Sequence, residues 1–136
     1  MLDASVLVKW FRPEGEQYVD EAVALQRLYE SGALLVTVPP LLYLEMLNSA
    51  SRRWHWDAAR LNNLADVLVG FAFRSQQPAV RAVARWAIAG LTAYDACYVA
   101  LAEELSTFVV TADDLMLRLG GDRARSLAGV AAEFGA

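Results

Sequence analysis

Apolar residues recur along this chain in two alternating patterns. At helical spacing they predict helices over about residues 16–30, 40–54, 57–68, 78–90, 94–105 and 115–119. Short continuous apolar runs predict buried strands at residues 1–2, 34–38, 71–73 and 107–110. In the helix after Pro78, the side chains expected to face inward are Val80, Val83, Ala84, Ala87 and Ile88. Strands that alternate with helices predict an α/β fold, with a parallel sheet covered by helices on both faces.

Acidic residues fall where the predicted strands end and where the helices begin. Asp3 directly follows the first apolar run, and Asp113 and Asp114 follow residues 107–110. Glu45 lies in the helix after Pro40, and Asp95 lies three residues after Thr92. Functional sites of such sheets lie outside the carboxyl ends of the strands. We therefore expect these acids to converge on one edge of the sheet.

Carboxylates that meet at one edge repel one another, by about 4 kcal/mol for a pair 4 Å apart at an effective dielectric constant of 20. A divalent cation offsets this repulsion. Because the chain has one cysteine, Cys97, and one histidine, His55, carboxylates must supply the ligands, which points to a hard ion such as Mg²⁺ or Mn²⁺. A structural alternative stays open, because Thr92–Asp95 and Thr111–Asp114 have the spacing of capping boxes at helix starts.

Composition narrows the class of protein further. The 136 residues are 57% hydrophobic and 21% charged, which predicts a single folded domain over residues 1–136. The uncharged stretch at residues 31–44 contains two prolines and is too short for a membrane span, and charged residues interrupt the N-terminus where a signal peptide would be apolar. We expect a cytoplasmic protein. The net charge of −4 argues against a large basic surface for nucleic acid, although all but one of the 12 basic residues are Arg.

Four segments resemble one known family, and they occur in the family's order. They are DASVLVKWF at residues 3–11, PPLLYLEMLN at residues 39–48, LTAYDACYVALA at residues 91–102 and VTAD at residues 110–113. Together they resemble PIN-domain ribonucleases, and specifically the VapC toxins of bacterial toxin–antitoxin pairs.

This resemblance implies a three-layer α/β/α fold, with a parallel sheet of about five strands whose last strand lies near residues 125–128. It implies an endoribonuclease that uses Mg²⁺ or Mn²⁺ to activate water. Asp3, Glu45, Asp95 and Asp113 would be catalytic, with Asp3, Asp95 and Asp113 as metal ligands and Asp114 as an accessory acid. The partners implied are RNA, a VapB-type antitoxin and a second copy of the chain, and the excess of apolar residues is consistent with such interfaces.

Several neighbouring side chains have two interpretations each. Ser5 either hydrogen-bonds a metal-bound water or a phosphate, or caps the next turn. Asn48, one helical turn from Glu45, is expected to orient that acid or contact substrate. Thr92 is an accessory site residue or, more simply, a helix cap. Arg52, two turns from Glu45, and Lys9 are candidates for phosphate contacts, although solvated surface positions are the commoner outcome for such residues.

Aromatic and thiol side chains in these segments favour structural roles. Trp54 and Trp56 are expected to pack against a neighbouring helix or a partner rather than stack on RNA bases. Cys97 lies on the apolar stripe of its helix and is expected to be buried, and His55 has no second histidine to act with.

Two other functions are alternatives to the nuclease. A non-catalytic PIN-like module that binds RNA or protein would not need all four acids. A doubly wound phosphatase would need a second aspartate two residues after Asp3, where this chain has Ser5. Dependence of RNA cleavage on a divalent ion separates these possibilities.

Overall fold

The first strand position is reduced to a single bridge. In the computed structural model, which describes residues 1–135, Leu2 pairs in parallel with Val110. The Val110 N–H donates to the Met1 carbonyl at 2.8 Å, and the Asp3 N–H donates to the Val110 carbonyl at 3.3 Å. The chain then turns directly into α1 (Ala4–Phe11), so Asp3 lies at the junction of a strand position and a helix start. Residue 136, the last of the expected domain, lies outside the described residues.

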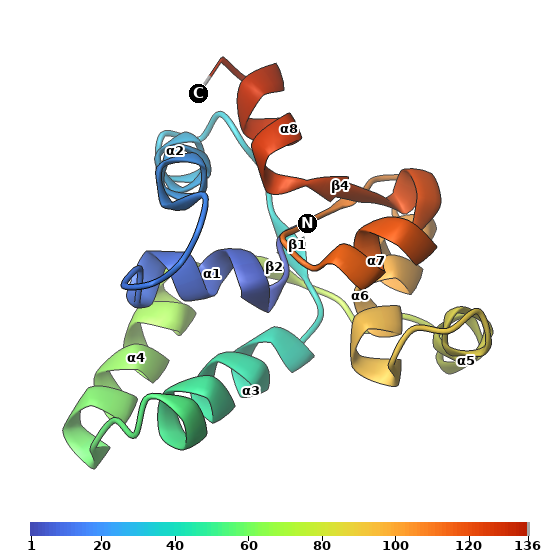
Figure 1. Ribbon diagram of the computed structural model, residues 1–136. Coiled ribbons are helices and arrows are strands. Elements are labelled where there is room, and N and C mark those ends of the chain that lie inside the picture. Colours follow the sequence, from blue (N-terminus) through green and yellow to red (C-terminus); the bar gives the residue numbers. More distant parts are fainter. Residues whose placement is uncertain (136) are drawn as a thin grey trace.

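Helices dominate the rest of the chain, and they surround the short strands near the middle of the molecule (Figure 1). In chain order the elements are α2 (Val19–Glu30), β1 (Thr37–Val38), α3 (Leu41–Asn48), a π-helical turn (Ser49–Arg53), α4 (Ala58–Gly70), β2 (Arg74–Ser75), α5 (Val80–Ile88), α6 (Ala93–Glu104), β3 (Val109–Thr111), α7 (Asp114–Leu119), a 3₁₀ turn (Gly121–Arg123), β4 (Ala124–Ser126) and α8 (Leu127–Glu133).

Parallel pairing is confirmed, but the sheet of about five strands is not present among residues 1–135. β1 pairs with β2, and β3 pairs with β4, each in parallel, to give two two-stranded sheets. The ladders are short because helices or prolines follow at once: Pro39 ends β1, and β3 leads into α7. The mean strand is longer than these.

Two predicted strands are wrong in extent or position. Within the run at residues 34–38, only Thr37 and Val38 form a ladder, and Leu35 is 72% exposed. The strand predicted at residues 71–73 lies instead at β2. Phe71 and Phe73 pack against Trp10 with ring centroids 5.5 Å and 6.4 Å away, so their apolar character reflects an aromatic cluster and not a strand.

Helix α6 lies at the centre of the core. Its side chains are buried without interruption over residues 96–102, as expected for a helix that other elements surround. Cys97 is 6% exposed, which confirms the prediction that it is buried. Asp95 is only half-buried at the start of this helix, so the core anchors a carboxylate at its edge.

Helix α5 is packed less tightly than its sequence predicts. It contacts α6, and Val83 and Ala87 pack against the core. However, Val80 and Ile88 are 78% and 87% exposed, and Ala84 is also exposed, so the expectation that they face inward is wrong. The apolar residues of α5 therefore extend beyond the side that faces the core.

The C-terminal segment forms a strand and a helix, of which only the strand was expected. The last strand is β4, slightly before the expected residues 125–128, and Ser126 caps α8 by accepting a hydrogen bond from the Gly129 N–H at 3.1 Å. Helix α8 packs against α2. Between residues 1 and 135, no helix combines the length and the apolar character that crossing a bilayer requires.

Candidate functional site

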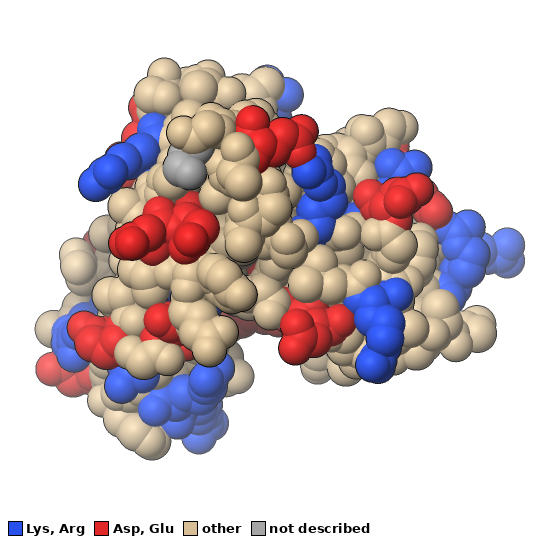
Figure 2. Space-filling view, turned by 45° about the horizontal axis from the view of Figure 1, so that its top comes forward, with Lys and Arg blue, Asp and Glu red and all other residues tan. Residues whose placement is uncertain are grey.

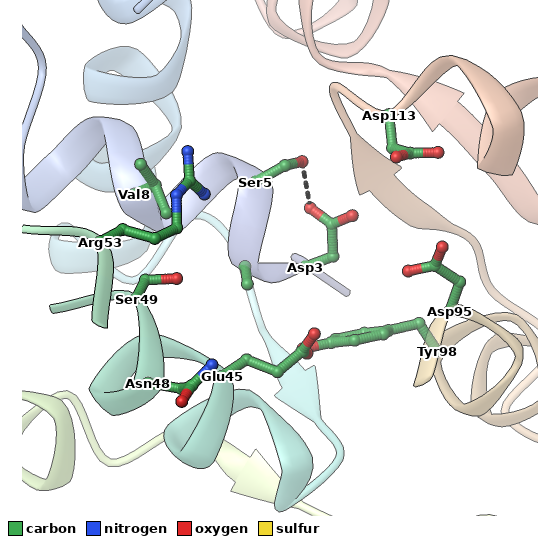
Figure 3. A pocket seen from close by; sticks show the side chains of 11 residues that line it. Asp3, Ser5, Val8, Glu45, Asn48, Ser49, Arg53, Asp95, Tyr98 and Asp113 are labelled. Atoms are coloured by element: carbon green, nitrogen blue, oxygen red, sulfur yellow. Dashed lines mark hydrogen bonds between the residues drawn. The ribbon is translucent and has the colours of Figure 1, made fainter. Parts of the chain in front are cut away.

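The four acids that the sequence singles out line one cavity of about 270 Å³ (Figure 3). They come from the start of α1, from α3, from the first turn of α6 and from the start of α7. The cavity is lined by Asp3, Ala4, Ser5, Val8, Glu45, Asn48, Ser49, Arg53, Asp95, Tyr98 and Asp113. Parallel pairing at Leu2 and β3 explains part of this convergence, because both chain segments leave the strands at the same edge.

Asp3 is the most deeply buried of the acids, with 4% of its surface exposed. Its Oδ1 accepts a hydrogen bond from the Ser5 hydroxyl at 2.5 Å, and its Oδ2 accepts one from the Thr111 hydroxyl at 2.5 Å. Burial raises the pKa of Asp3 to about 6; the two hydroxyls oppose that shift, and the charge of Asp95 adds to it. Ser5 therefore supports the site carboxylate directly through its hydroxyl.

The same two hydroxyls fix the turn between β3 and α7. The Ala112 N–H donates to the Ser5 Oγ at 2.9 Å, and the Asp113 N–H donates to the Thr111 Oγ1 at 3.0 Å. The capping-box spacing predicts that Thr111 caps α7, but it does not. The cap is Asp113, whose Oδ1 accepts from the Met116 N–H at 2.8 Å. Asp113 therefore uses one carboxylate oxygen to cap α7, and its other oxygen stays available in the cavity.

Asp95 and Asp114 occupy similar positions at helix starts, but only Asp95 lines the cavity. Thr92 caps α6 by accepting from the Asp95 N–H at 3.1 Å, so Thr92 acts as the helix cap and does not line the cavity. Asp114, the accessory acid expected from the resemblance, is exposed on α7 and is not among the residues that line the cavity.

Tyr98 lines the cavity although its position in the sequence gives it no candidate role at the site. Its side chain is 1% exposed, and its hydroxyl donates to the Glu45 Oε1 at 2.6 Å. This bond joins α6 to α3 across the cavity. Burial raises the pKa of Glu45, and the Tyr98 hydrogen bond opposes that rise. A tyrosine on the buried side of a helix needs a hydrogen-bond partner for its hydroxyl. That requirement is the feature of the sequence that could have identified Tyr98 as a neighbour of the polar site.

Charge repulsion links the acids. Burial raises the pKa of Asp95, and the charge of Asp113 raises it further. The charge of Asp95 in turn raises the pKa values of Asp3 and Glu45. Asp95 therefore interacts electrostatically with each of the other three carboxylates, which is the pattern expected where a cation would be held.

The donor set is suited to a hard divalent cation, but the side chains are not drawn together around one point. Within residues 1–135, no three acidic, histidine or cysteine side chains are grouped closely enough to hold a metal ion as they stand. Oxygen-only ligands are those that Mg²⁺ and Mn²⁺ prefer.

The basic residues expected near the site are only partly placed there. The Lys9 Nζ pairs with the Glu16 Oε1 at 2.9 Å and its side chain is 5% exposed, so its charge is used within the fold and it does not line the cavity. Arg52 is exposed and does not line the cavity, whereas Arg53 does. Asn48 lines the cavity, as its spacing from Glu45 predicts.

The tryptophans beside this segment pack as expected. The Trp54 and Trp56 rings lie 5.0 Å apart, and both pack against the core. The guanidinium of Arg12 lies over Trp54 at 5.8 Å, and that of Arg60 lies over Trp56 at 4.2 Å. The two tryptophan rings are therefore covered by guanidinium groups and by the core, which favours a structural role for both.

Comparison with known proteins places the chain in a family. No curated protein sequence matches it. Among solved structures, the crystal structure of PAE2754 from Pyrobaculum aerophilum is similar, with a TM-score of 0.71 and 20% sequence identity, over 98% of this chain and 93% of that one. At this identity the likeness shows the fold alone. The profile of the PIN domain matches residues 1–122, which is most of the chain, and the chain therefore belongs to the PIN domain family.

Proposed function

We propose that this chain is a divalent-metal-dependent endoribonuclease of the VapC type, the toxin of a toxin–antitoxin pair, which hydrolyses RNA phosphodiester bonds. The observation that carries the proposal is the convergence of Asp3, Glu45, Asp95 and Asp113 on one cavity. PIN domains are generally nucleases and typically use divalent metals, which agrees with this arrangement of acids.

Asp3, Asp95 and Asp113 would hold the cation, and Glu45 would complete the set directly or through water. All their donor atoms are carboxylate oxygens, and each of Asp3, Glu45 and Asp95 has a raised pKa in the absence of a cation. When bound, a Mg²⁺ or Mn²⁺ ion supplies Lewis-acid activation of water and of the phosphodiester.

The chain's own residues prepare the carboxylates for this task. Ser5 and Thr111 hold both oxygens of Asp3 in place, and the same hydroxyls fix the backbone that leads into Asp113. Tyr98 holds one oxygen of Glu45 and leaves the other available. These bonds orient Asp3 and Glu45 individually, and the acids would still have to draw together around the cation, since no three within residues 1–135 are grouped closely enough to hold it as they stand.

Exposed apolar side chains support the proposed protein partners, a VapB-type antitoxin and a second copy of the chain. Leu44, Val80, Ile88 and Tyr94 are between 64% and 87% exposed. They lie on α3, α5 and α6, and three of them, Leu44, Val80 and Tyr94, line one groove beside the acidic cavity. Large exposed apolar patches mark interaction surfaces. A basic antitoxin side chain would complement the carboxylates of the cavity.

The test is RNA cleavage by the purified protein with and without Mg²⁺ or Mn²⁺, repeated with Asp95→Asn. We expect cleavage that requires the ion, that EDTA stops and that Asp95→Asn abolishes. Cleavage that persists in EDTA, or that survives the substitution, contradicts the proposal. RNA binding without any ion-dependent cleavage would support the alternative of a non-catalytic binding module.

A further inference from the structure

The helix that carries Glu45 ends in an unusual turn. α3 runs into a π-helical turn at Ser49–Arg53, in which the Trp54 N–H donates to the Ser49 carbonyl at 3.1 Å, five residues back. Such turns contain one residue more than an α-helical turn and are frequent at functional sites.

The extra residue changes which arginine faces the acids. On a regular α-helix the seventh residue after Glu45 lies about 20° from its direction and the eighth about 80° away. Regular spacing therefore favours Arg52, the seventh residue. The π-helical turn shifts later side chains back by about one position, and Arg53 takes the place that Arg52 would have. Both arginines are exposed, but Arg53 lines the cavity and Arg52 does not.

The cavity has two chemically different sides (Figure 3). Asp95 and Asp113 lie together on one side, and the labelled side chain of Arg53 lies on the other, near Ser49. Asp3 and Ser5 lie between them. The acid side offers only acceptors, which suits a cation. The Arg53 side offers the guanidinium and the Ser49 hydroxyl, which suits an anion.

Arg53 is distinguished from the neighbouring arginines by its surroundings. The ion pairs within residues 1–135 use Lys9, Arg85 and Arg125. Arg12 and Arg60 lie over tryptophan rings. Arg53 is the arginine that lines the carboxylate cavity.

Basic and acidic side chains are interspersed on the face shown in Figure 2, in keeping with a net charge of −4. A chain with this net charge attracts a polyanion only weakly by its overall charge. Single contacts inside the cavity therefore matter more for a nucleic acid than they would on a basic protein.

We propose that Arg53 binds a backbone phosphate of the RNA strand in this cavity, beside the carboxylates that would hold the cation. The inference rests on the proposed function and adds to it the residue that positions the substrate. A guanidinium donates two parallel hydrogen bonds to a phosphate, so it fixes orientation as well as charge.

RNA affinity tests the inference, measured by fluorescence anisotropy of a labelled single-stranded oligonucleotide in EDTA, where the proposed cleavage is off. We expect Arg53→Ala to weaken binding about tenfold or more and to reduce the slope of log affinity against log salt concentration by about 0.7. Arg52→Ala is the matched control, with the same change of charge one residue away, and we expect it to change affinity less than twofold. Arg53→Lys should recover part of the loss, because it keeps the charge without the paired donors.

The opposite order of effects overturns the inference: an Arg52→Ala loss equal to or larger than that of Arg53→Ala means that the arginine favoured by regular helical spacing makes the contact. Absence of RNA binding by the unaltered chain, or an unchanged affinity in Arg53→Ala, overturns it as well. Cleavage with Mn²⁺, measured on the same preparations, reports separately on the proposed function. If the unaltered chain cleaves RNA and Arg53→Ala binds it equally well, only the phosphate contact is wrong. If Arg53 matters for binding and nothing is cleaved, only the nuclease is wrong.

Discussion

Replacing Asp3 by asparagine should make the protein more stable at neutral pH. The folded chain holds this carboxylate at 4% exposure and raises its pKa from 3.8 to about 6. At about 1.4 kcal/mol for each pKa unit, ionised Asp3 costs the fold up to about 3 kcal/mol at pH 7. Asn removes the charge but weakens hydrogen bonds from Ser5 and Thr111, which contribute about 1 kcal/mol each. The net gain expected is about 1–2 kcal/mol.

The pH dependence of this gain has a definite sign. A carboxyl group whose pKa is raised on folding binds protons more tightly in the folded state, so its ionisation lowers stability as the pH rises from about 4 to about 6. The advantage of Asp3→Asn should therefore be complete above pH 6 and absent below pH 4. Urea unfolding of both proteins in EDTA, at pH 4, 5, 6 and 7.5, measures it. Since about 1 kcal/mol shifts the melting temperature of a chain this size by about 3–4 °C, a thermal scan should show a rise of about 3–8 °C.

A loss of stability in Asp3→Asn at pH 7.5 would refute this reasoning. It would mean that the side chain acts as a helix cap or as an ion-pair partner, although Asp3 makes no side-chain capping bond to α1. A gain that is the same at every pH would be equally inconsistent, because the proposed cause is the charge alone.

Three further perturbations separate the site from its scaffold. Tyr98→Phe removes the donor to Glu45 and should lower stability by about 1–2 kcal/mol in urea unfolding and reduce RNA cleavage several-fold, whereas an unchanged cleavage rate would show that this bond does not orient Glu45. Thr92→Ala removes the cap of α6 and should cost about 1 kcal/mol with cleavage kept within about twofold, and a large loss of cleavage would instead make Thr92 part of the site. Affinity for Mn²⁺, measured by calorimetry, should rise at least about tenfold from pH 5 to pH 7 as Asp3 ionises, and a flat profile would exclude Asp3 as a ligand.

The sequence predicted the acids and their meeting place because strand ends and helix starts are local features. Asp3 follows a strand position, and Asp113 follows β3, so one parallel bridge brings them to the same edge. Helices α2 to α7 were likewise predictable from periodicity, whereas α1 and α8 were not predicted. The extent of the strands was not predictable, because a ladder depends on which segments lie side by side in the fold. Residues 71–73 are apolar because Phe71 and Phe73 belong to an aromatic cluster.

Errors at the site came from geometry that residue spacing does not record. A Thr three residues before an acid fits a capping box equally well at Thr92 and at Thr111, but only Thr92 caps a helix, because Thr111 is drawn to the buried Asp3. Regular helical spacing favours Arg52, and the π-helical turn brings Arg53 to the cavity instead. Lys9 is placed by an ion pair to Glu16, a loop residue whose position follows only from the fold.

Apolar patterning also failed to separate core from outer surface. Val80 and Ile88 have the spacing of inward-facing residues on α5, and both are exposed. Periodicity shows that a side chain avoids water and not which surface covers it, so a core position and an interface position give the same signal.

The central claim is that Asp3, Glu45, Asp95 and Asp113 bind one kind of ligand together, a divalent cation. Titration of the protein with Mn²⁺ at pH 7.5, with free Mn²⁺ measured by electron paramagnetic resonance, tests it without reference to RNA. We expect saturable binding that weakens at least about tenfold in Asp95→Asn and Asp113→Asn. Asp114→Asn, at the exposed neighbour of Asp113, should bind as the unaltered chain does. No saturable binding, or equal losses in Asp113→Asn and Asp114→Asn, would contradict the account.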